Sequence, residues 1–173
     1  MAQTPLSIRL QGGDRRSIGN SNEVAASVAR RPELFPELVE CMSSDDALVR
    51  MRAADAAEKV TLKRPELLEP FKEELLALAD ETTQMELRWH LALMLPRLVL
   101  TRPERRRAMA ALKRYLSDRS SIVKTCALQG LADLARSHEE FEAEVLRLLE
   151  KVGRTGTPAM KARSRKLMTR LTK

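Results

Sequence analysis

A short pattern recurs four times along the chain at a nearly constant spacing. Each copy is an apolar residue followed by a base, and the copies stand 38, 36 and 37 residues apart, beginning at Val49, Leu87, Val123 and Met160. Eleven residues before each copy stands a leucine: Leu38, Leu76, Leu112 and Leu149. Because this register extends over more than one helix length, the repeating unit must contain two helices and the turn between them.

The composition leaves little material for a β-sheet. Aromatic residues make up 3% of the chain and six residues are glycine, whereas apolar residues make up 43% of its 173 residues. Leu, Ala, Val and Met can therefore fill one helical core. We predict an all-α fold, a short right-handed α–α solenoid of about four helix pairs with an N-terminal half-repeat.

The first 20 residues lack a sustained apolar period. They contain residues typical of an extended or mobile arm, namely Gly12, Gly13, Gly19 and the pair Arg15-Arg16. A short helix is expected over about residues 21–30, ended by Pro32, and it would cover the open end of the stack as the half-repeat. We therefore expect an arm over residues 1–20 and a single repeat domain over residues 21–173.

Each repeat opens with a proline or an acidic pair. Proline suits the first turn of a helix, where its missing N–H has no partner, and the openings stand at Pro32, Pro65, Pro103 and Glu139. Since Pro36 and Pro70 follow closely, the first helices of repeats one and two either begin there or are kinked after a short opening turn. Turn residues further on predict second helices from about Asp46, Thr83, Ser121 and Pro158. Pro96 should kink the second of these helices or leave it short of one hydrogen bond.

Apolar residues at spacings of three and four predict one buried stripe on each second helix. The four stripes are Val49, Ala53, Ala56, Ala57 and Val60; Leu87, Leu91, Met94, Leu95 and Leu98; Val123, Ala127, Gly130, Leu131 and Leu134; and Met160, Leu167, Met168 and Leu171. These stripes should form the core between successive helix pairs.

The motifs around the turns resemble a known family. Proline opens the first helix, aspartates such as Asp46 and Asp118 occupy the turn, and Val49-Arg50 opens a second helix. In these features the chain resembles HEAT repeats over about residues 21–173. The resemblance implies an armadillo-type α-solenoid whose second helices line a concave groove. It does not imply one function, because HEAT arrays serve transport, phosphatase scaffolding, chromosome organisation and base excision alike.

The outward positions of the second helices are the candidate partner site that this resemblance implies. They are Arg52, Lys59, Trp89, His90, Leu93, Arg97, Gln129, Arg163, Lys166 and Arg170. The groove would be basic at its ends and neutral in the middle. Trp89 could anchor a partner peptide or stack on a base. The alternatives are that the charges are merely solvated and that Trp89 packs at a seam between repeats.

A row of bases follows the opening apolar residues: Arg50, Arg88, Lys124 and Lys161. In HEAT repeats a base at this position usually reaches the turn acid of its own or the next repeat, which predicts an intramolecular ladder rather than a ligand site. The second repeat has no aspartate in its turn. Arg88 would therefore need Glu86 or an acid from a neighbouring repeat.

No pattern in the chain supports catalysis. His90 and His138 do not recur with cysteine or carboxylates at a ligand spacing, and there is no Gly-rich phosphate loop or nucleophile elbow. HEAT-like DNA glycosylases share the architecture, but they combine several groove tryptophans with an acid and an arginine, whereas Trp89 is the one tryptophan here. We expect no enzyme activity, cofactor or metal.

The placement of charge and cysteine bears on partners and location. Cys41 and Cys126 lie inside helical patterns, and the longest apolar stretch, residues 91–95, is far short of the roughly 20 residues of a membrane span. With no leader-like start, these features predict a reduced, cytoplasmic, monomeric protein. The formal charge is +7, and the excess of bases lies in the C-terminal half.

The sequence therefore favours a non-catalytic scaffold or adaptor that binds another protein along the groove. The alternative is weak, sequence-independent binding of nucleic acid through the basic C-terminal half. Its bases are Arg105, Arg106, Arg107, Lys113, Arg114, Arg119, Arg154, Arg163, Arg165, Lys166 and Arg170.

Overall fold

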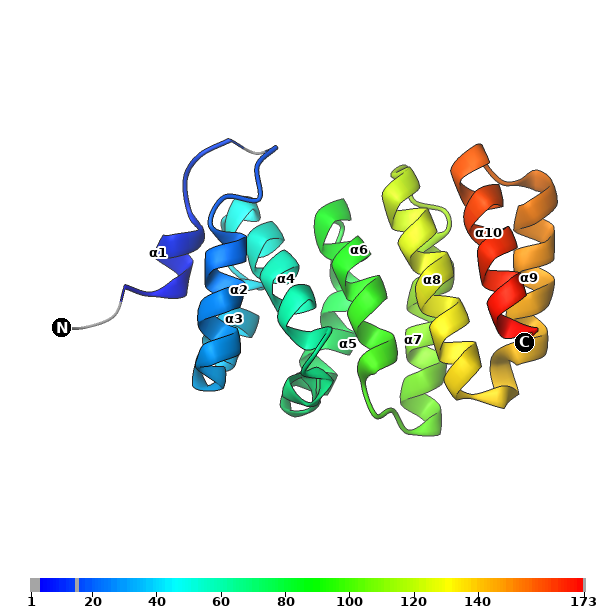
Figure 1. The fold of residues 1–173 in the computed structure, drawn as a ribbon, viewed down its shortest axis with the longest axis horizontal. Helices are drawn as coiled ribbons and strands as arrows, with labels where there is room; N and C mark the ends of the chain where they lie inside the picture. Colours follow the sequence, from blue (N-terminus) through cyan, green and yellow to red (C-terminus); the bar gives the residue numbers. More distant parts are fainter. Residues whose placement is uncertain (1–3, 15, 173) are drawn as a thin grey trace. The chain divides into compact units, whose positions relative to one another are not determined.

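The computed structural model describes residues 4–14 and 16–172, and helices are the only regular elements in those two ranges (Figure 1). Residues 1–3 and Arg15 of the expected arm, and Lys173 at the end of the expected domain, lie outside them. The chain divides into two compact units, unit 1 (Met1–Lys72) and unit 2 (Glu73–Lys173). The all-α fold that the sequence predicts is confirmed, and the extent of a single domain over residues 21–173 stays a prediction.

Unit 1 holds two helix pairs and the 3-10 segment that opens the next pair. Its elements are α1 (Leu6–Leu10), α2 (Ser21–Arg30), the 3-10 turn η1 (Pro32–Leu34), α3 (Phe35–Cys41), α4 (Ala47–Thr61) and the 3-10 segment η2 (Pro65–Phe71). Helix α3 packs on α4, α2 packs on α4, and α1 packs on both α3 and α4. Helix α1 also packs on α2, so these two helices form a pair that precedes α3 and α4.

Helix α1 (Leu6–Leu10) occupies part of the segment, residues 1–20, for which the sequence predicts an extended or mobile arm. Leu6 and Leu10 are fully buried, and the N–H of Leu6 donates to Oε1 of Glu37 at 2.6 Å. The half-repeat that was expected from residues 21–30 thus has a first helix. A helix of five residues is too short to show a period in the sequence, and burial of its two leucines on α3 and α4 stabilises it.

Unit 2 continues the same alternation of first and second helices. Its elements are α5 (Lys72–Glu81), α6 (Met85–Met94), the 3-10 turn η3 (Leu95–Arg97), α7 (Arg102–Tyr115), α8 (Ser121–Ser137), the 3-10 turn η4 (Glu139–Phe141), α9 (Glu142–Thr155) and α10 (Pro158–Leu171). Helix α8 packs against α6 on one side and α10 on the other, so the three second helices stand side by side (Figure 1).

Capping residues explain where the second helices begin. The side chains of Asp46, Ser120 and Thr157 each accept a hydrogen bond from a backbone N–H in the first turn of α4, α8 and α10. Such caps satisfy N–H groups that have no partner inside the helix. The starts expected at Asp46, Ser121 and Pro158 are confirmed to within one residue, whereas α6 begins two residues later than expected, at Met85.

The prolines that open the first two repeats act as the sequence predicts, whereas Pro96 follows the end of α6 instead of kinking it. In the first two repeats, η1 and η2 form the short opening turn, and α3 and α5 begin beside Pro36 and Pro70. Helix α6 ends at Met94, and the chain continues through Pro96 as the turn η3. Proline lacks the N–H that an α-helix would need there.

The predicted stripes form the cores of the two units. Every residue of the stripes on α4, α6 with η3, and α8 is buried, as are Met160 and Leu167 on α10. Met168 and Leu171, close to the chain end, are only half-buried. Gly130 marks a close approach of α8 to α6, because a Cβ there would lie 2.3 Å from the carbonyl oxygen of Ala92.

Candidate partner-binding surface

The outward side of the three second helices in unit 2 is the strongest candidate for a binding surface. We define the second-helix surface by Trp89, Leu93, Gln129, Arg163, Lys166 and Arg170. Trp89, Leu93 and Gln129 are half-buried, and the three bases of α10 are exposed. Its two ends therefore differ in chemistry, apolar on α6 and basic on α10.

Polar contacts join α8 to α10 across this surface. Nη1 of Arg163 donates to Oε1 of Gln129 at 3.1 Å, and Nε2 of Gln129 donates to Oδ2 of Asp133 at 2.9 Å. Arg163 thereby points along α8 instead of pairing with a carboxylate. Gln129, the neutral residue predicted for the middle of the groove, orients the basic one.

Four of the predicted groove residues lie at the α6 end, namely Trp89, His90 and Leu93 in α6 and Arg97 in η3. Trp89 packs its ring beside that of His90, with the centroids 5.5 Å apart. His90 is only 7% exposed, so its expected place on the partner surface is wrong. It lies one residue before the buried Leu91 and three after the buried Leu87, which puts its side chain on the inner side of α6. Arg97, in η3, is half-buried.

Arg52 is the clearest departure from the predicted groove. It is 1% exposed, and its guanidinium donates to four backbone carbonyls of the described N-terminal segment. Nη1 bonds the oxygens of Leu10, at 2.8 Å, and Gly12, while Nη2 bonds Asp14 at 3.1 Å and Nε bonds Ser17 at 3.2 Å. A side chain whose donors are used in this way is a structural one.

Glycines let the segment wrap around this guanidinium. Gly12, Gly13 and Gly19 all have positive φ, which L-residues with a side chain rarely adopt. A Cβ on Gly19 would lie 2.7 Å from Cζ of Arg52. The same three glycines suggested an arm in the sequence, but they shape a loop around a buried arginine.

Lys59 is also committed to the chain's own N-terminal part. It pairs with Asp55, one turn earlier on α4, and its Nζ donates to Oδ1 of Asn22 at 2.7 Å. The carboxylate of Asp55 also accepts from the hydroxyl of Ser21. These contacts tie α2 to α4, so the basic end predicted for the groove at Arg52 and Lys59 does not exist as a free surface.

In the row Arg50, Arg88, Lys124 and Lys161, the two arginines make contacts within the protein. These two bases are therefore structural. Arg88 pairs with Asp118 of the next repeat, with Nη1 and Oδ2 2.6 Å apart, and its Nε donates to the carbonyl of Thr82 at 2.9 Å. The acid from a neighbouring repeat is thus confirmed. Arg50 instead donates to carbonyls of its own turn, those of Ser44 at 2.6 Å and Asp45 at 3.1 Å.

Most bases of α7 are neutralised by acids of other first-helix segments. Arg102 and Arg105 pair with Glu140, Arg107 with Glu73 and Asp80, Lys113 with Glu144, and Arg114 with Asp80. Burial alone would raise the pKa of Asp80, but hydrogen bonds from Arg107 and Arg114 outweigh it and hold that pKa below its usual value. These bases belong to the predicted nucleic-acid surface, but their charge is neutralised by ion pairs within the protein.

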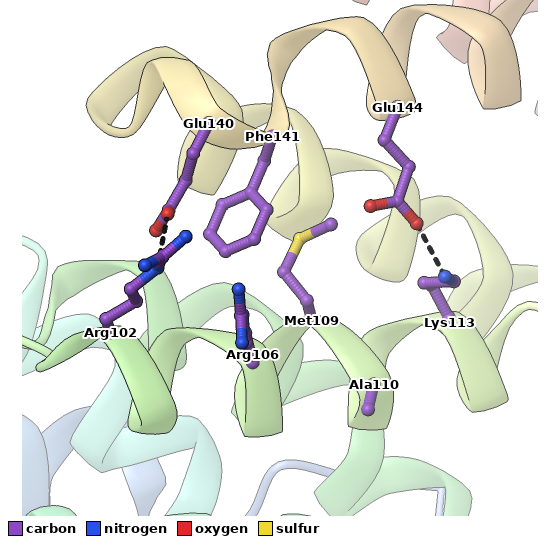
Figure 2. Close-up of a pocket in the computed structure, with 8 residues that line it drawn as sticks. All are labelled: Arg102, Arg106, Met109, Ala110, Lys113, Glu140, Phe141 and Glu144. Carbon is purple, nitrogen blue, oxygen red and sulfur yellow. Dashed lines mark hydrogen bonds and ion pairs between the residues drawn. The ribbon is translucent and has the colours of Figure 1, made fainter.

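A hollow of about 310 Å³ lies between α7 and the start of α9 (Figure 2). Its two ends are closed by the pairs Arg102–Glu140 and Lys113–Glu144, and Met109 and Phe141 lie between them. Both apolar residues are nearly buried, so they offer a ligand little surface. The hollow is a seam between two first helices, and we assign it no ligand.

Neither a metal cluster nor a reactive Cys41 thiol occurs among the residues that the structure describes. No group of three or more His, Cys, Asp or Glu side chains in that part of the chain could hold a metal ion. Burial, followed by the charges of Glu37 and Glu40, raises the pKa of Cys41 to about 11, which leaves its thiol protonated at neutral pH. Neither Cys41 nor Cys126 forms a disulfide within the described residues, and no described helix is long and apolar enough to cross a membrane.

Comparison with known proteins supports the repeat assignment. None of the curated proteins matches the chain. A family model described as a HEAT repeat domain matches residues 9–171, which is nearly the whole chain and begins inside α1. Since the helix pairs, the proline openings and the arginine that reaches the next turn all agree with this match, the chain belongs to the HEAT repeat family.

Proposed function

We propose that the chain is a non-catalytic protein-interaction module whose partner binds the second-helix surface of unit 2. The observation that carries this proposal is a contrast between the units. In unit 1 the outward positions of α4 are held by the chain's own N-terminal part, through Arg52 and Lys59. In unit 2 the matching positions of α10 hold Arg163 and Arg170, and both are exposed.

The chemistry of the surface indicates the kind of partner. A half-buried Trp89 beside Leu93 can receive an apolar side chain, and aromatic residues are frequent anchors of interfaces. Arg163, Lys166 and Arg170 favour acidic residues on the partner. An acidic segment with one apolar anchor fits both ends. HEAT repeats commonly serve as protein-interaction scaffolds, which agrees with an adaptor role. We further propose that this adaptor is cytoplasmic and monomeric.

Capture from a nuclease-treated native extract tests this proposal if the variants are matched. We expect Trp89→Ala to lose a partner that the parent chain retains, whereas Leu62→Ala, at an exposed leucine of unit 1, should retain it. Likewise, Arg163→Glu with Lys166→Glu should lose the partner, and Arg147→Glu with Lys151→Glu, on the exposed side of α9, should not. Equal loss in both members of each pair would reject the second-helix surface.

Sequence-independent nucleic-acid binding is the second candidate, and a separate observation favours it. The bases of α7 are largely paired with acids, so they contribute little to an exposed positive field. The bases of α9 and α10 have no acidic partner among the described residues. Positive charge that is not neutralised within the protein attracts polyanions.

A further inference from the structure

The last helix pair carries an unusual excess of exposed base. Between Val145 and Thr172 the chain has one acid, Glu150, and eight bases, which are Arg147, Lys151, Arg154, Lys161, Arg163, Arg165, Lys166 and Arg170. Within the described ranges none of the eight forms an ion pair, and all are exposed except Lys161, which is half-buried. In α7, by contrast, acids from α5, η4 and α9 neutralise five bases.

On α10 these bases lie in two rows. Met160, Ser164 and Leu167 face the core. Arg163 lies on the side of α8, because it donates to Gln129. An α-helix turns by about 100° per residue, so Lys161 and Arg165, each two residues from Arg163, lie about 200° around the helix on the other side.

The two rows differ in their neighbours. Lys166 and Arg170 follow Arg163 at helical spacing and lie on the side of α8. Lys161 and Arg165 are one turn apart on the side turned away from it. Between the rows the exposed residues Ala162 and Thr169 are small, so a ligand can approach the helix axis closely.

We propose that this face of α10 binds the sugar–phosphate backbone of duplex nucleic acid, with one row of bases on each side of a strand. The inference deepens the second candidate function and rests on it. A helix of 14 residues is about 21 Å long, which covers several phosphates of one strand. Every charged side chain on α10 is a base, so backbone contacts dominate and the binding is independent of sequence.

A duplex is favoured over a single strand because α10 has no aromatic residue. Proteins that hold single strands commonly stack bases on aromatic side chains. Trp89 lies on α6, separated from α10 by α8. The face of α10 therefore offers charge without a stacking platform.

The test is the salt dependence of binding to a fluorescently labelled, mixed-sequence DNA duplex, followed by anisotropy from about 50 to about 200 mM salt. The informative variant changes Lys161→Gln and Arg165→Gln, which leaves the second-helix surface intact. Its matched control changes Lys113→Gln and Arg114→Gln. Both variants remove one lysine and one arginine, but the control bases are paired with Glu144 and Asp80.

We expect the first variant to flatten the slope of log affinity against log salt by about 2, since each lost phosphate contact removes about 0.9. The control should keep the parent slope, and thermal melts should show that both variants are folded. A second duplex of different sequence should bind with the same affinity.

Other outcomes separate the possible failures. Equal slope changes in the two variants would show that only net charge matters, which would overturn the α10 face but leave the second candidate function. No binding by the parent chain would reject both. Tighter binding to phosphatidylserine vesicles than to the duplex, lost in the Lys161/Arg165 variant, would assign the face to a membrane surface and overturn the duplex proposal.

Discussion

Nη1 of Arg88, in the first turn of α6, donates to Oδ2 of Asp118, in the turn before α8, at 2.6 Å. The guanidinium carbon of Arg88 also lies 5.3 Å from the ring centre of Tyr115, whose hydroxyl donates to the carbonyl of Ala79 at 2.7 Å. Because Arg88 also donates to the carbonyl of Thr82, its side chain links the turn before α6, the turn before α8 and the end of α7. Because the side chain of Asp118 is only 7% exposed, this pair is screened less than a surface ion pair.

Removing the arginine should lower stability without touching the proposed binding surfaces. We expect Arg88→Met to reduce the free energy of unfolding by about 0.5–2 kcal/mol, the range for lost charge-assisted hydrogen bonds. Lys124→Met should cost less, because Lys124 acts on Asp118 only through its charge. Urea unfolding measures both. Loss of partner binding at unchanged stability would instead assign the row to a ligand.

The same pair predicts a dependence on pH. Burial would raise the pKa of Asp118, but hydrogen bonds from the Ser120 N–H and from Arg88 outweigh it and lower that pKa. The carboxylate therefore stabilises the fold fully above its unfolded pKa of about 3.9, and this stability is lost as pH falls through the folded pKa. The stability advantage of the parent chain over Arg88→Met should accordingly be constant near neutral pH and shrink below about pH 4. Unfolding curves of the two proteins over acidic pH would show it.

Two helix glycines should respond oppositely to alanine. A Cβ on Gly130 would collide with the backbone of Ala92 and the side chain of Leu112, so Gly130→Ala should destabilise the protein by about 1–3 kcal/mol. A Cβ on Gly153, in α9, meets nothing within 4 Å, and Gly153→Ala should stabilise it by about 0.4–1 kcal/mol. Thermal melts of the two variants compare them directly. Equal effects would mean that α6 and α8 do not approach so closely.

The buried Arg52 of unit 1 should hold the N-terminal segment in its folded conformation. Arg52→Met leaves the carbonyls of Leu10, Asp14 and Ser17 without their donor, and we expect a loss of about 1–3 kcal/mol. Arg52→Lys should recover only part of this loss. An ammonium can still donate to some of these carbonyls, but it has fewer donors in a less suitable geometry. Limited proteolysis should cut residues 11–20 faster in the methionine variant. Unchanged proteolysis would mean that other contacts hold the segment.

The sequence by itself determined the parts of this protein that depend on local order. Helix limits follow from Asp46, Ser120 and the prolines, because caps and missing N–H groups act within one turn. The buried stripes follow from spacing, because a residue such as Leu131 has one favourable place on an amphipathic helix. The repeat period then requires that successive pairs stack, which is why the family could be recognised from the chain alone.

Only the tertiary structure decided which charged residues are exposed and available to a binding partner. Arg107 and Arg147 look alike in the sequence, yet Asp80 neutralises the first and no described acid pairs with the second. Arg52 and Arg163 occupy matching positions, but one is buried under carbonyls of residues about 40 positions earlier and the other is exposed. Such pairings depend on which distant segments fold together, and no local pattern encodes that distance.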